Sequence, residues 1–339
     1  MMIDLRSDTV TRPTPAMLEA MMRAPLGDDV FGDDPSVQHL EEKAADLFGK
    51  EAGLFCPSGT MANQIAIKVH TQPGNEVICD QTAHIYNYEG GGVAFNSGCS
   101  VRLIAGDRGR FNAEQVRTTL NPDDIHYPLS RLVVIENTSN KGGGSCWDLQ
   151  EIKAIEGICS KHGLALHLDG ARVFNAMRAT GLMARDLGRP FHTISLCLSK
   201  GLGAPVGSVL LGSREHIRAA RRVRKVLGGG MRQAGILAAA GTYALDHHVE
   251  RLDDDHRRAM KLARALEAHP CVDSVLPPQT NILIFNLRET TSPESFLEAL
   301  RKQGILAVGF GPRAIRFVTH LDVDDAMAEK VCQVLGHIS

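Results

Sequence analysis

Short apolar runs alternate with amphipathic segments between residues 53 and 212. The run TISLCL at 193–198 has the length and composition of a buried strand, and so has LALHLDG at 164–170. The preceding segment at 147–163 carries apolar residues at helical spacing. Strands separated by helices of this length are typical of βαβ units. The sequence therefore predicts an α/β fold with a mostly parallel sheet that helices cover on both faces.

The same alternation predicts the other elements of this region. Asp34 and Pro35 begin an amphipathic helix, and Gly49 ends it. We expect further strands at 53–57, 76–80, 100–104, 131–137 and 208–212, and further helices from 57 and at 112–120.

The two ends of the chain differ from this central pattern. Residues 1–14 have an extended, β-branched character, so we interpret them as an N-terminal arm. A long helical stretch from about 236 to 268 is followed by strands and helices of an α+β tail. We therefore expect an arm at 1–14, a large domain at 15–245 and a smaller C-terminal α+β domain at 246–339.

Composition excludes several classes of protein. The 339 residues have 43% apolar content and a net charge of −2, with charges of both signs interspersed. Neither a nucleic-acid surface nor a membrane-binding patch is indicated. No apolar run reaches the length of a membrane span, and the first residues lack the apolar centre of a signal peptide. The eight cysteines include no C-x-x-C pair. This usage favours a reduced, cytoplasmic protein without disulfides or a zinc site.

The stretch SLCLSKGLGAPVGS at 195–208 gives the first chemical signal. An apolar strand ends at Ser199 and Lys200, and a glycine-rich turn leads to the next strand. A lysine that leaves a buried strand can lose contact with solvent, which favours the free amine that attacks a carbonyl. A lysine at a strand end also commonly extends into solvent, so this stretch alone does not identify a Schiff-base lysine.

A second signal is the turn Pro57-Ser58-Gly59-Thr60, where a strand passes into a helix. Small residues and free N–H groups at the start of a helix suit a phosphate group. An ordinary capping turn has the same composition. The sequence has no Walker motif and no G-x-G-x-x-G, so nucleotide-binding functions lack their main support.

Asp169 follows the strand LALHL, at its carboxyl tip. A carboxylate there could bind a metal, orient a histidine or hold a proton on the ring nitrogen of a heterocycle. A metal would need further ligands, and we interpret His167, on the same side of the strand, as structural. A phosphate turn, Asp169 and Lys200, in this order, are what pyridoxal phosphate requires. His84, after the strand at 76–80, could stack on the pyridine ring, although a surface loop gives the same pattern.

Eight segments in chain order resemble the low-specificity threonine aldolases, a family of fold-type-I pyridoxal-phosphate enzymes. The resemblance extends from residue 3 to about residue 325 without a large insertion. The segments are LRSDTVTRPT, VFGDDPSVQHLE, PSGTMANQ, AHIYNYE, HLDGAR, CLSKGLGAPVGS, GGGMRQAG and IRFVTH.

The resemblance implies a role for individual residues. Lys200 would form the Schiff base with the cofactor, Asp169 would pair with the pyridine nitrogen and His84 would stack on the ring. The remaining implied roles are contacts to the cofactor and its phosphate by Ser58, Gly59, Thr60, Arg172, Lys225 and Arg232, and binding of the substrate carboxylate by Ser7, Arg172 and Arg316.

The activity implied by the resemblance is retro-aldol cleavage of L-threonine or L-allo-threonine to glycine and an aldehyde. A β-eliminating lyase or an aminotransferase on the same fold is the alternative. A non-catalytic regulator that binds the cofactor is disfavoured, because the lysine, the aspartate and the carboxylate-binding residues are all present and no DNA-binding segment is attached. We expect a small amino-acid substrate and no metal.

Two further expectations concern the substrate's β-hydroxyl group. A histidine suits the base, since it exchanges a proton near neutral pH. His84 is one candidate, and His126, between two prolines in a loop, is the other. The chain departs from the family's pattern at Ser139, where a histidine is usual, and this difference puts the preference between the two epimers in doubt.

The segment RVRKVLGGGMRQAG at 222–235 indicates how copies of the chain associate. A cationic helix ends in three glycines, and a helix rich in small residues follows. Small residues permit close approach of another backbone, within the chain or between chains. We expect a homo-oligomer, a dimer or a tetramer, with its sites near a dimer interface.

Overall fold

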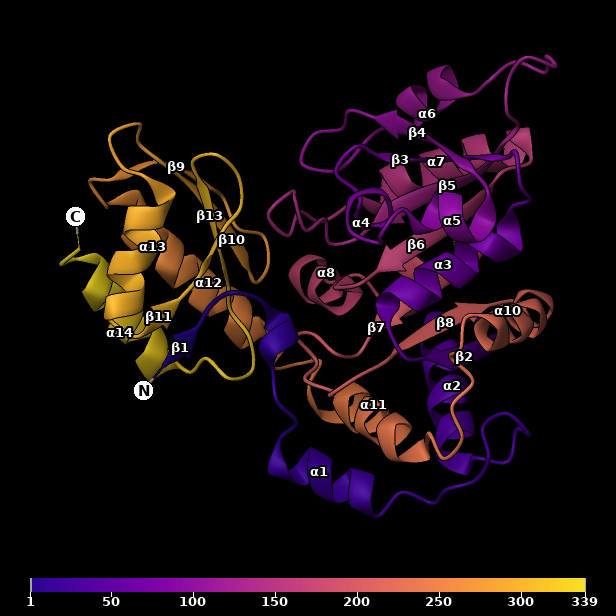
Figure 1. Cartoon of the computed structure of the whole chain (residues 1–339), viewed down its shortest axis with the longest axis horizontal. Helices are drawn as coiled ribbons and strands as arrows, with labels where there is room; N and C mark the ends of the chain where they lie inside the picture. The colour runs from indigo at the N-terminus through magenta and orange to yellow at the C-terminus, as the bar shows by residue number, and fades with distance from the viewer. Residues whose placement is uncertain (1, 339) are drawn as a thin grey trace.

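The structure is a computed structural model that describes residues 2–338. Figure 1 shows two bodies, a large one around a seven-stranded sheet and a small one around a four-stranded sheet. The large sheet has the order β2 (Ala52–Cys56), β8 (Ser208–Gly212), β7 (Thr193–Cys197), β6 (Ala165–Gly170), β5 (Ser130–Glu136), β3 (Glu76–Asp80) and β4 (Ser100–Ile104).

The pairing within this sheet is mostly parallel. Strand β8 runs antiparallel to both β2 and β7, and the pairings among β7, β6, β5, β3 and β4 are all parallel. The predicted fold class is thereby confirmed. Because β5, β6 and β7 are parallel neighbours, their carboxyl ends meet at one edge of the sheet, where α/β proteins bind ligands.

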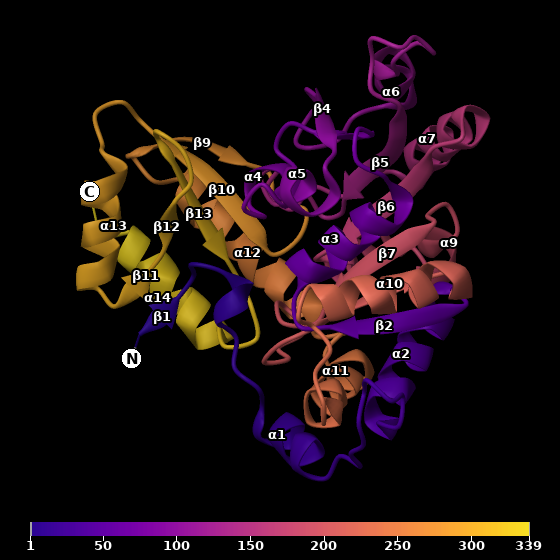
Figure 2. The same cartoon turned by 45° about the vertical axis from the view of Figure 1, so that its right-hand side comes forward.

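Helices cover both faces of the large sheet (Figure 2), because alternate residues of a strand point to opposite sides. In β5, Val133 and Ile135 pack into one apolar cluster, whereas Leu132 and Val134 pack into another. The first face carries α2 (Pro35–Phe48), α6 (Ala113–Thr119), α7 (Leu149–His162), α8 (Val173–Thr180), α9 (Ala184–Gly188) and α11 (Gly235–His247), with α1 (Pro15–Met22) packed on α11. The second face carries α3 (Gly59–His70), α4 (His84–Asn87), α5 (Gly92–Ser97) and α10 (Arg214–Val226).

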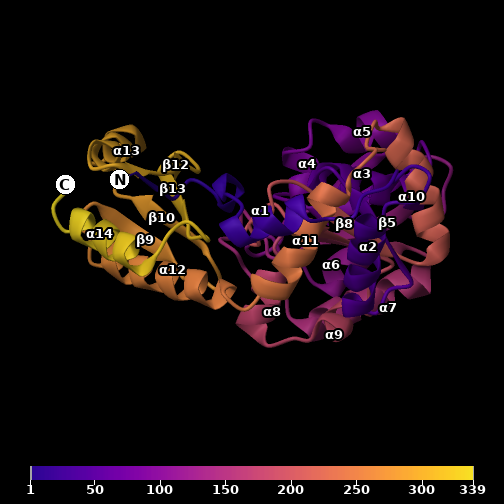
Figure 3. The same ribbon diagram turned by 90° about the horizontal axis from the view of Figure 1, so that it is seen from below.

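The small body has its own apolar core and lies at one side of the large one (Figure 3). Its antiparallel sheet has the order β12 (Val308–Gly309), β13 (Ala314–Val318), β10 (Ile282–Leu287) and β9 (Val272–Leu276). Its helices are α12 (Leu252–Glu267), α13 (Pro293–Lys302) and α14 (Asp325–Leu335). Strand β1 (Ile3–Asp4) pairs with β11 (Ile305–Leu306), so the start of the chain belongs to this body.

Two predictions about local structure are wrong. The stretch at 236–268 is not one helix, since α11 ends at His247 and α12 begins at Leu252. The intervening His248 and Arg251 donate hydrogen bonds to carbonyls of the loop after β7, which holds the bend. The arm is not extended throughout, because Asp8–Val10 form a short 3-10 helix whose first N–H groups Ser7 caps.

Within residues 2–338, no helix combines the length and the apolar character that crossing a membrane requires.

Candidate active site

A cavity of about 160 Å³ opens at the carboxyl ends of β6 and β7. It brings together five residues predicted from the sequence as site residues, although they lie on four different segments of the chain. These are Gly59, Thr60, His84, Asp169 and Lys200, and the other lining residues are Thr9, Asn63, Ala171, Ser195, Cys197 and Ser199.

The start of α3 forms one wall of this cavity. The side chain of Ser58 accepts a hydrogen bond from the N–H of Met61 at 3.1 Å and so caps the helix. The first N–H groups of a helix have no partner within it, and they lie at the positive end of its dipole. A Cβ on Gly59 would lie 3.4 Å from Oγ of Ser208, a buried hydroxyl without a hydrogen-bond partner within residues 2–338. This wall therefore offers unused polar groups to an anion.

Asp169 is buried and fixed by hydrogen bonds. Asn63, on the second turn of α3, donates to its Oδ2 at 2.9 Å, and the N–H of Ala171 donates to its Oδ1 at 3.2 Å. The same amide nitrogen of Asn63 donates to Oε1 of Glu89 at 2.9 Å. Ser195 donates to the amide oxygen of Asn63 at 2.6 Å. The carboxylate of Asp169 is therefore held in one orientation at the cavity wall.

His84 is the first residue of α4, and its ring lies beside Glu89. Its Nδ1 is 3.0 Å from Oε1 of that carboxylate. Burial opposes a charge on the ring, but the bond to Glu89 and the charge of Asp169 outweigh it and raise the pKa of His84. The backbone N–H of His84 donates to Glu136 at 2.8 Å. Burial and the nearby Asp169 raise the pKa of Glu136 to about 7.

His84, Glu89 and Asp169 could also be considered as metal ligands, since one ligand atom from each lies within 4.8 Å of the others. The amide N–H groups of Asn63 point at the oxygens of both carboxylates. These donors occupy the positions that a cation would need, so the arrangement favours a hydrogen-bonded network.

The predicted carboxylate-binding residues lie where the arm meets both bodies. Arg172 donates to Asp8 through Nε at 2.7 Å and through Nη2 at 2.6 Å. Both residues are buried, and although burial raises the pKa of Asp8, the charge and hydrogen bonds of Arg172 outweigh it and lower that pKa to about 2. Ser7 immediately precedes Asp8, and its Oγ accepts a hydrogen bond from Thr9 at 2.8 Å.

Arg316, on β13, presents its guanidinium beside these groups. It donates to Asn140 and to the carbonyl of Arg6, each at 2.8 Å. Its Nε is buried and has no partner among the described residues. Burial and the charge of Arg172 lower the pKa of Arg316 to about 10. The free N–H group leaves Arg316 able to bind an additional anion.

Seven predicted residues do not line the cavity of their own chain, namely Ser7, Ser58, Arg172, Arg316, Lys225, Arg232 and His126. The first four belong to the segments described above, and the last three lie elsewhere. Lys225 lies in the last turn of α10, and the side chain of Arg232 is 56% exposed and pairs with Asp28 at 3.0 Å. His126 is 79% exposed, bonds to Asp124 at 2.7 Å and precedes β5, at the edge of the sheet opposite the cavity.

The loop with the unusual Ser139 is closed on itself. Ser139 is buried, its N–H donates to the carbonyl of Ser145 at 3.1 Å and its hydroxyl accepts from the N–H of Gly142 at 3.2 Å. A Cβ on Gly109 would lie 2.0 Å from that hydroxyl. Ser139 therefore packs tightly and supports the loop.

The chain is similar in sequence to known lyases. Residues 4–290 match the family model of beta-eliminating lyases. The low specificity L-threonine aldolase of Escherichia coli K12 is 44% identical over 337 residues, which cover 99% of this chain and 98% of that one. The chain belongs to the low-specificity L-threonine aldolase family.

Solved structures share the fold at lower identity. The threonine aldolase of Leishmania major superposes with a TM-score of 0.87 at 23% identity and covers 98% of both chains. A structure of SPT with a PLP internal aldimine superposes with a TM-score of 0.76 at 18% identity, covering 98% of this chain and 86% of that one. These structures show that the fold is shared with pyridoxal-phosphate enzymes. The similarity to the threonine aldolases makes this chain a carbon–carbon lyase.

Several residues of this site were not predicted from the sequence, namely Asp8, Asn63, Glu89 and Glu136. Asn63 lies one helical turn after the phosphate turn, on the face of α3 that meets the cavity. That spacing is one signal by which it could have been found. Asp8, Asn63 and Glu89 also lie in the segments LRSDTVTRPT, PSGTMANQ and AHIYNYE, and Glu89 bonds to His84, five residues before it. The contact of Asp8 with Arg172, by contrast, joins distant parts of the chain.

Proposed function

We propose that this chain binds pyridoxal phosphate and cleaves β-hydroxy-α-amino acids, with L-threonine and L-allo-threonine as substrates, to glycine and an aldehyde. One observation carries the proposal. A single cavity combines an amine at the end of β7, a carboxylate at the end of β6 and the start of α3. The name of the E. coli relative supports the retro-aldol reaction.

The residues of the cavity fit this cofactor. The first turn of α3 and the unpartnered hydroxyl of Ser208 suit its phosphate, and glycine at 59 leaves room for it. Ser58 fixes this turn, and Thr60 lines it. Lys200 supplies the amine for the aldehyde, and Asp169 supplies the partner for the ring nitrogen.

When bound, the cofactor supplies a sink for the electron pair of the bond that breaks at the α-carbon. The chain's own groups orient and hold the substrate. Arg316 offers its unpartnered Nε to the carboxylate of the amino acid, and Ser7 lies beside it in the arm. Arg172 donates two hydrogen bonds to Asp8, so we assign Arg172 mainly to holding the arm against the site.

We assign removal of the proton from the substrate's β-hydroxyl group to His84 of the same chain. Its ring lines the cavity, and Glu89 fixes one nitrogen, which leaves the other for the substrate or the cofactor. His126 can take part only if a neighbouring copy brings it to the cavity.

We further propose a homo-oligomer, either a dimer or a tetramer, in which Lys225 and Arg232 serve a neighbour's cavity. Apolar side chains are exposed around these two residues. Val226 is 85% exposed and Phe31 is 76% exposed. The backbones of Asp29 and Arg232 are hydrogen-bonded, which brings the loop with Phe31 to the same surface. A second copy would cover this surface.

The remaining proposals concern the organisation and location of the protein. We propose that residues 15–245 hold the cofactor and that residues 246–339, with the arm at 1–14, close the site from the other side. Eight cysteines without a disulfide support a reducing compartment, the cytoplasm.

Product analysis tests this function. Purified protein with added pyridoxal phosphate and L-threonine should release acetaldehyde and glycine in equal amounts. Release of ammonia and a keto acid from threonine would instead favour the β-eliminating lyase after which the family model is named. A keto acid formed only in the presence of an amino-group acceptor would favour an aminotransferase.

A further inference from the structure

Three successive backbone carbonyls of the loop after β7 accept hydrogen bonds from side chains of other segments. Thr11 in the arm donates to the carbonyl of Lys200 at 3.0 Å. Arg251 donates to the carbonyl of Gly201 at 3.3 Å. His248 donates to the carbonyl of Leu202 at 2.7 Å. The loop that carries the proposed Schiff-base lysine is therefore held from outside by side chains, besides its own turn.

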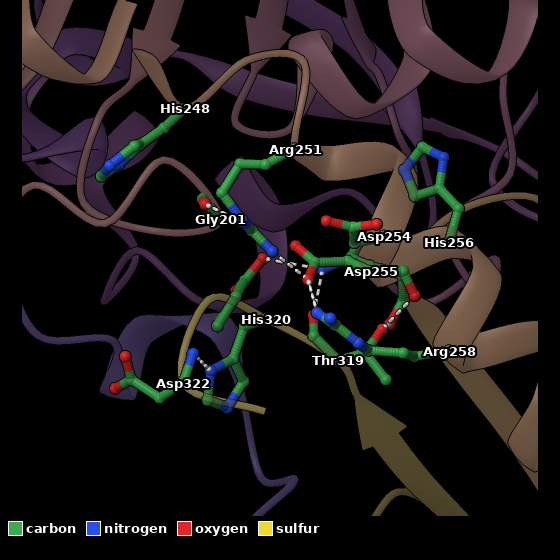
Figure 4. Close-up of polar contacts among 12 residues, drawn as sticks. Gly201, His248, Arg251, Asp254, Asp255, His256, Arg258, Thr319, His320 and Asp322 are labelled. Carbon is green, nitrogen blue, oxygen red and sulfur yellow. Dashed lines mark hydrogen bonds and ion pairs between the residues drawn. The ribbon is translucent and has the colours of Figure 1, made fainter. Parts of the chain in front are cut away.

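Arg251 is itself held by a buried carboxylate (Figure 4). A second guanidinium nitrogen of Arg251 pairs with Oδ1 of Asp255, one turn into α12. The side chain of Asp255 is fully buried, and that of Arg251 is 16% exposed. Arg258 lies 3.7 Å from the same oxygen. A guanidinium with one donor on the carboxylate and another on the carbonyl of Gly201 has little freedom to turn.

The pair also contacts the small sheet. Thr319, directly after β13, donates to the backbone carbonyl of Asp255 at 2.6 Å. Arg316 lies on β13 only three residues earlier, so one strand carries both the substrate-binding arginine and this contact. A series of hydrogen bonds therefore connects Thr319 to Asp255, Asp255 to Arg251 and Arg251 to Gly201. This series links the small body to the lysine loop.

We propose that Arg251, oriented by Asp255, is a positioning residue that sets the conformation of the loop after β7 and thereby the approach of Lys200 to the cofactor. This inference rests on the proposed role of Lys200. A purely structural pair would behave differently. Arg251 and Asp255 are four residues apart on a helix, and a pair of that kind can stabilise the start of α12 without affecting the loop.

Hydrogen–deuterium exchange of cofactor-free protein separates the two roles. The N–H of Gly203 bonds to the carbonyl of Lys200 at 2.8 Å, and the N–H of Ala204 bonds to that of Leu198 at 3.1 Å, so the loop contains protected amides. In Arg251→Gln and Asp255→Asn, we expect exchange in the peptide covering 198–204 to accelerate by on the order of tenfold.

Two further variants complete the experiment. Arg257→Gln removes an exposed arginine of the same helix, which pairs with Asp254 and Asp325 at the surface, and it should leave the exchange of this peptide unchanged. Arg251→Lys keeps the charge, but one ammonium group cannot match the fork that spans both acceptors, so an intermediate exchange rate is expected. This variant carries the test if the loss of charge prevents folding.

A second readout uses the protein with pyridoxal phosphate bound. In Arg251→Lys and Asp255→Asn, the pH at which the visible absorbance of the lysine-bound cofactor changes should shift, and kcat should fall more than KM rises. A lower melting temperature with unchanged exchange in 198–204 and an unchanged absorbance titration would overturn the proposal. Failure of the proposed function is a separate result, since the exchange measurement needs neither cofactor nor turnover.

Discussion

Asn63 lies at the centre of the site, with its amide nitrogen 2.9 Å from Oδ2 of Asp169 and 2.9 Å from Oε1 of Glu89. Two carboxylates on one side of the amide require the NH2 group there, so the amide oxygen faces Ser195 and His167. Nε2 of His167 lies 3.2 Å from that oxygen, and Nδ1 of His167 lies 2.9 Å from the hydroxyl and 3.1 Å from the carbonyl of Thr193. The orientation of one amide thus fixes the aspartate and ties it to the histidine below it.

We predict that Asn63→Ala weakens cofactor binding and lowers kcat. The variant leaves two buried carboxylates without their shared donor, which costs about 1–3 kcal/mol, or about 5- to 150-fold. Spectroscopic titration of the apoprotein with pyridoxal phosphate measures the binding, and steady-state kinetics measures kcat. Asn96→Ala is the control, because Asn96 reaches this network only through Gln64 at 3.2 Å. Equal behaviour of the two variants would contradict the role of Asn63.

Arg316→Ala should mainly raise KM for threonine. The variant removes a charge-assisted hydrogen bond to the substrate's carboxylate, worth about 2 kcal/mol, so an increase of about 30-fold is expected with a smaller change in kcat. Arg313→Ala is a matched control on the same segment, since the side chain of Arg313 is 46% exposed. An unchanged KM in Arg316→Ala would reassign this arginine to structure.

The two histidine candidates should behave differently when each is changed to asparagine. His84→Asn should lower both cofactor retention and turnover, since His84 lines the cavity and bonds to Glu89. His126→Asn should change the rates with threonine and allo-threonine only in an assembly that brings His126 to a neighbour's cavity. Kinetics with both epimers, together with sedimentation, checks this prediction. If His126→Asn leaves both rates and their ratio unchanged in the oligomer, His126 has no part in the chemistry.

Folding stability should fall as the pH is lowered from 8 to 5. Burial lowers the pKa of His167 to about 4, whereas the unfolded chain binds this proton near pH 6.5. Between these values the unfolded chain holds more protons than the folded one, so stability decreases with falling pH, by about 2 kcal/mol at pH 5 from this residue.

The matched variant is His167→Gln, which can still donate to Asn63 but does not titrate. Its cofactor-free melting temperature should depend less on pH over this range than that of the unsubstituted protein. His162→Asn, at an exposed position, should keep the original dependence. A dependence that is the same in all three proteins would show that other groups cause the loss of stability at low pH.

The sequence was sufficient for the fold class and for the residues that follow strands directly. Lys200 and Asp169 were found because buried strands end beside them, and Gly59 was found because it starts a helix. The break between α11 and α12 was not predicted, since it depends on contacts of His248 and Arg251 with a loop some fifty residues earlier. Asp8 was missed for the same reason, since its partner Arg172 is 164 residues later in the chain. Glu89 lies five residues after His84, and this local spacing was not used. Lys225 and Arg232 were expected near a phosphate, and within one chain they lie at an exposed surface.

The central assignment, Lys200 as the residue that binds the cofactor covalently, is tested most directly by the absorbance spectrum of Lys200→Ala. The unsubstituted protein with pyridoxal phosphate should show a visible band that changes when L-threonine is added. Lys200→Ala should lack the protein-bound band before threonine is added and should release no acetaldehyde above background. A variant with the same band and the parent rate would show that another amine holds the cofactor and would contradict this account.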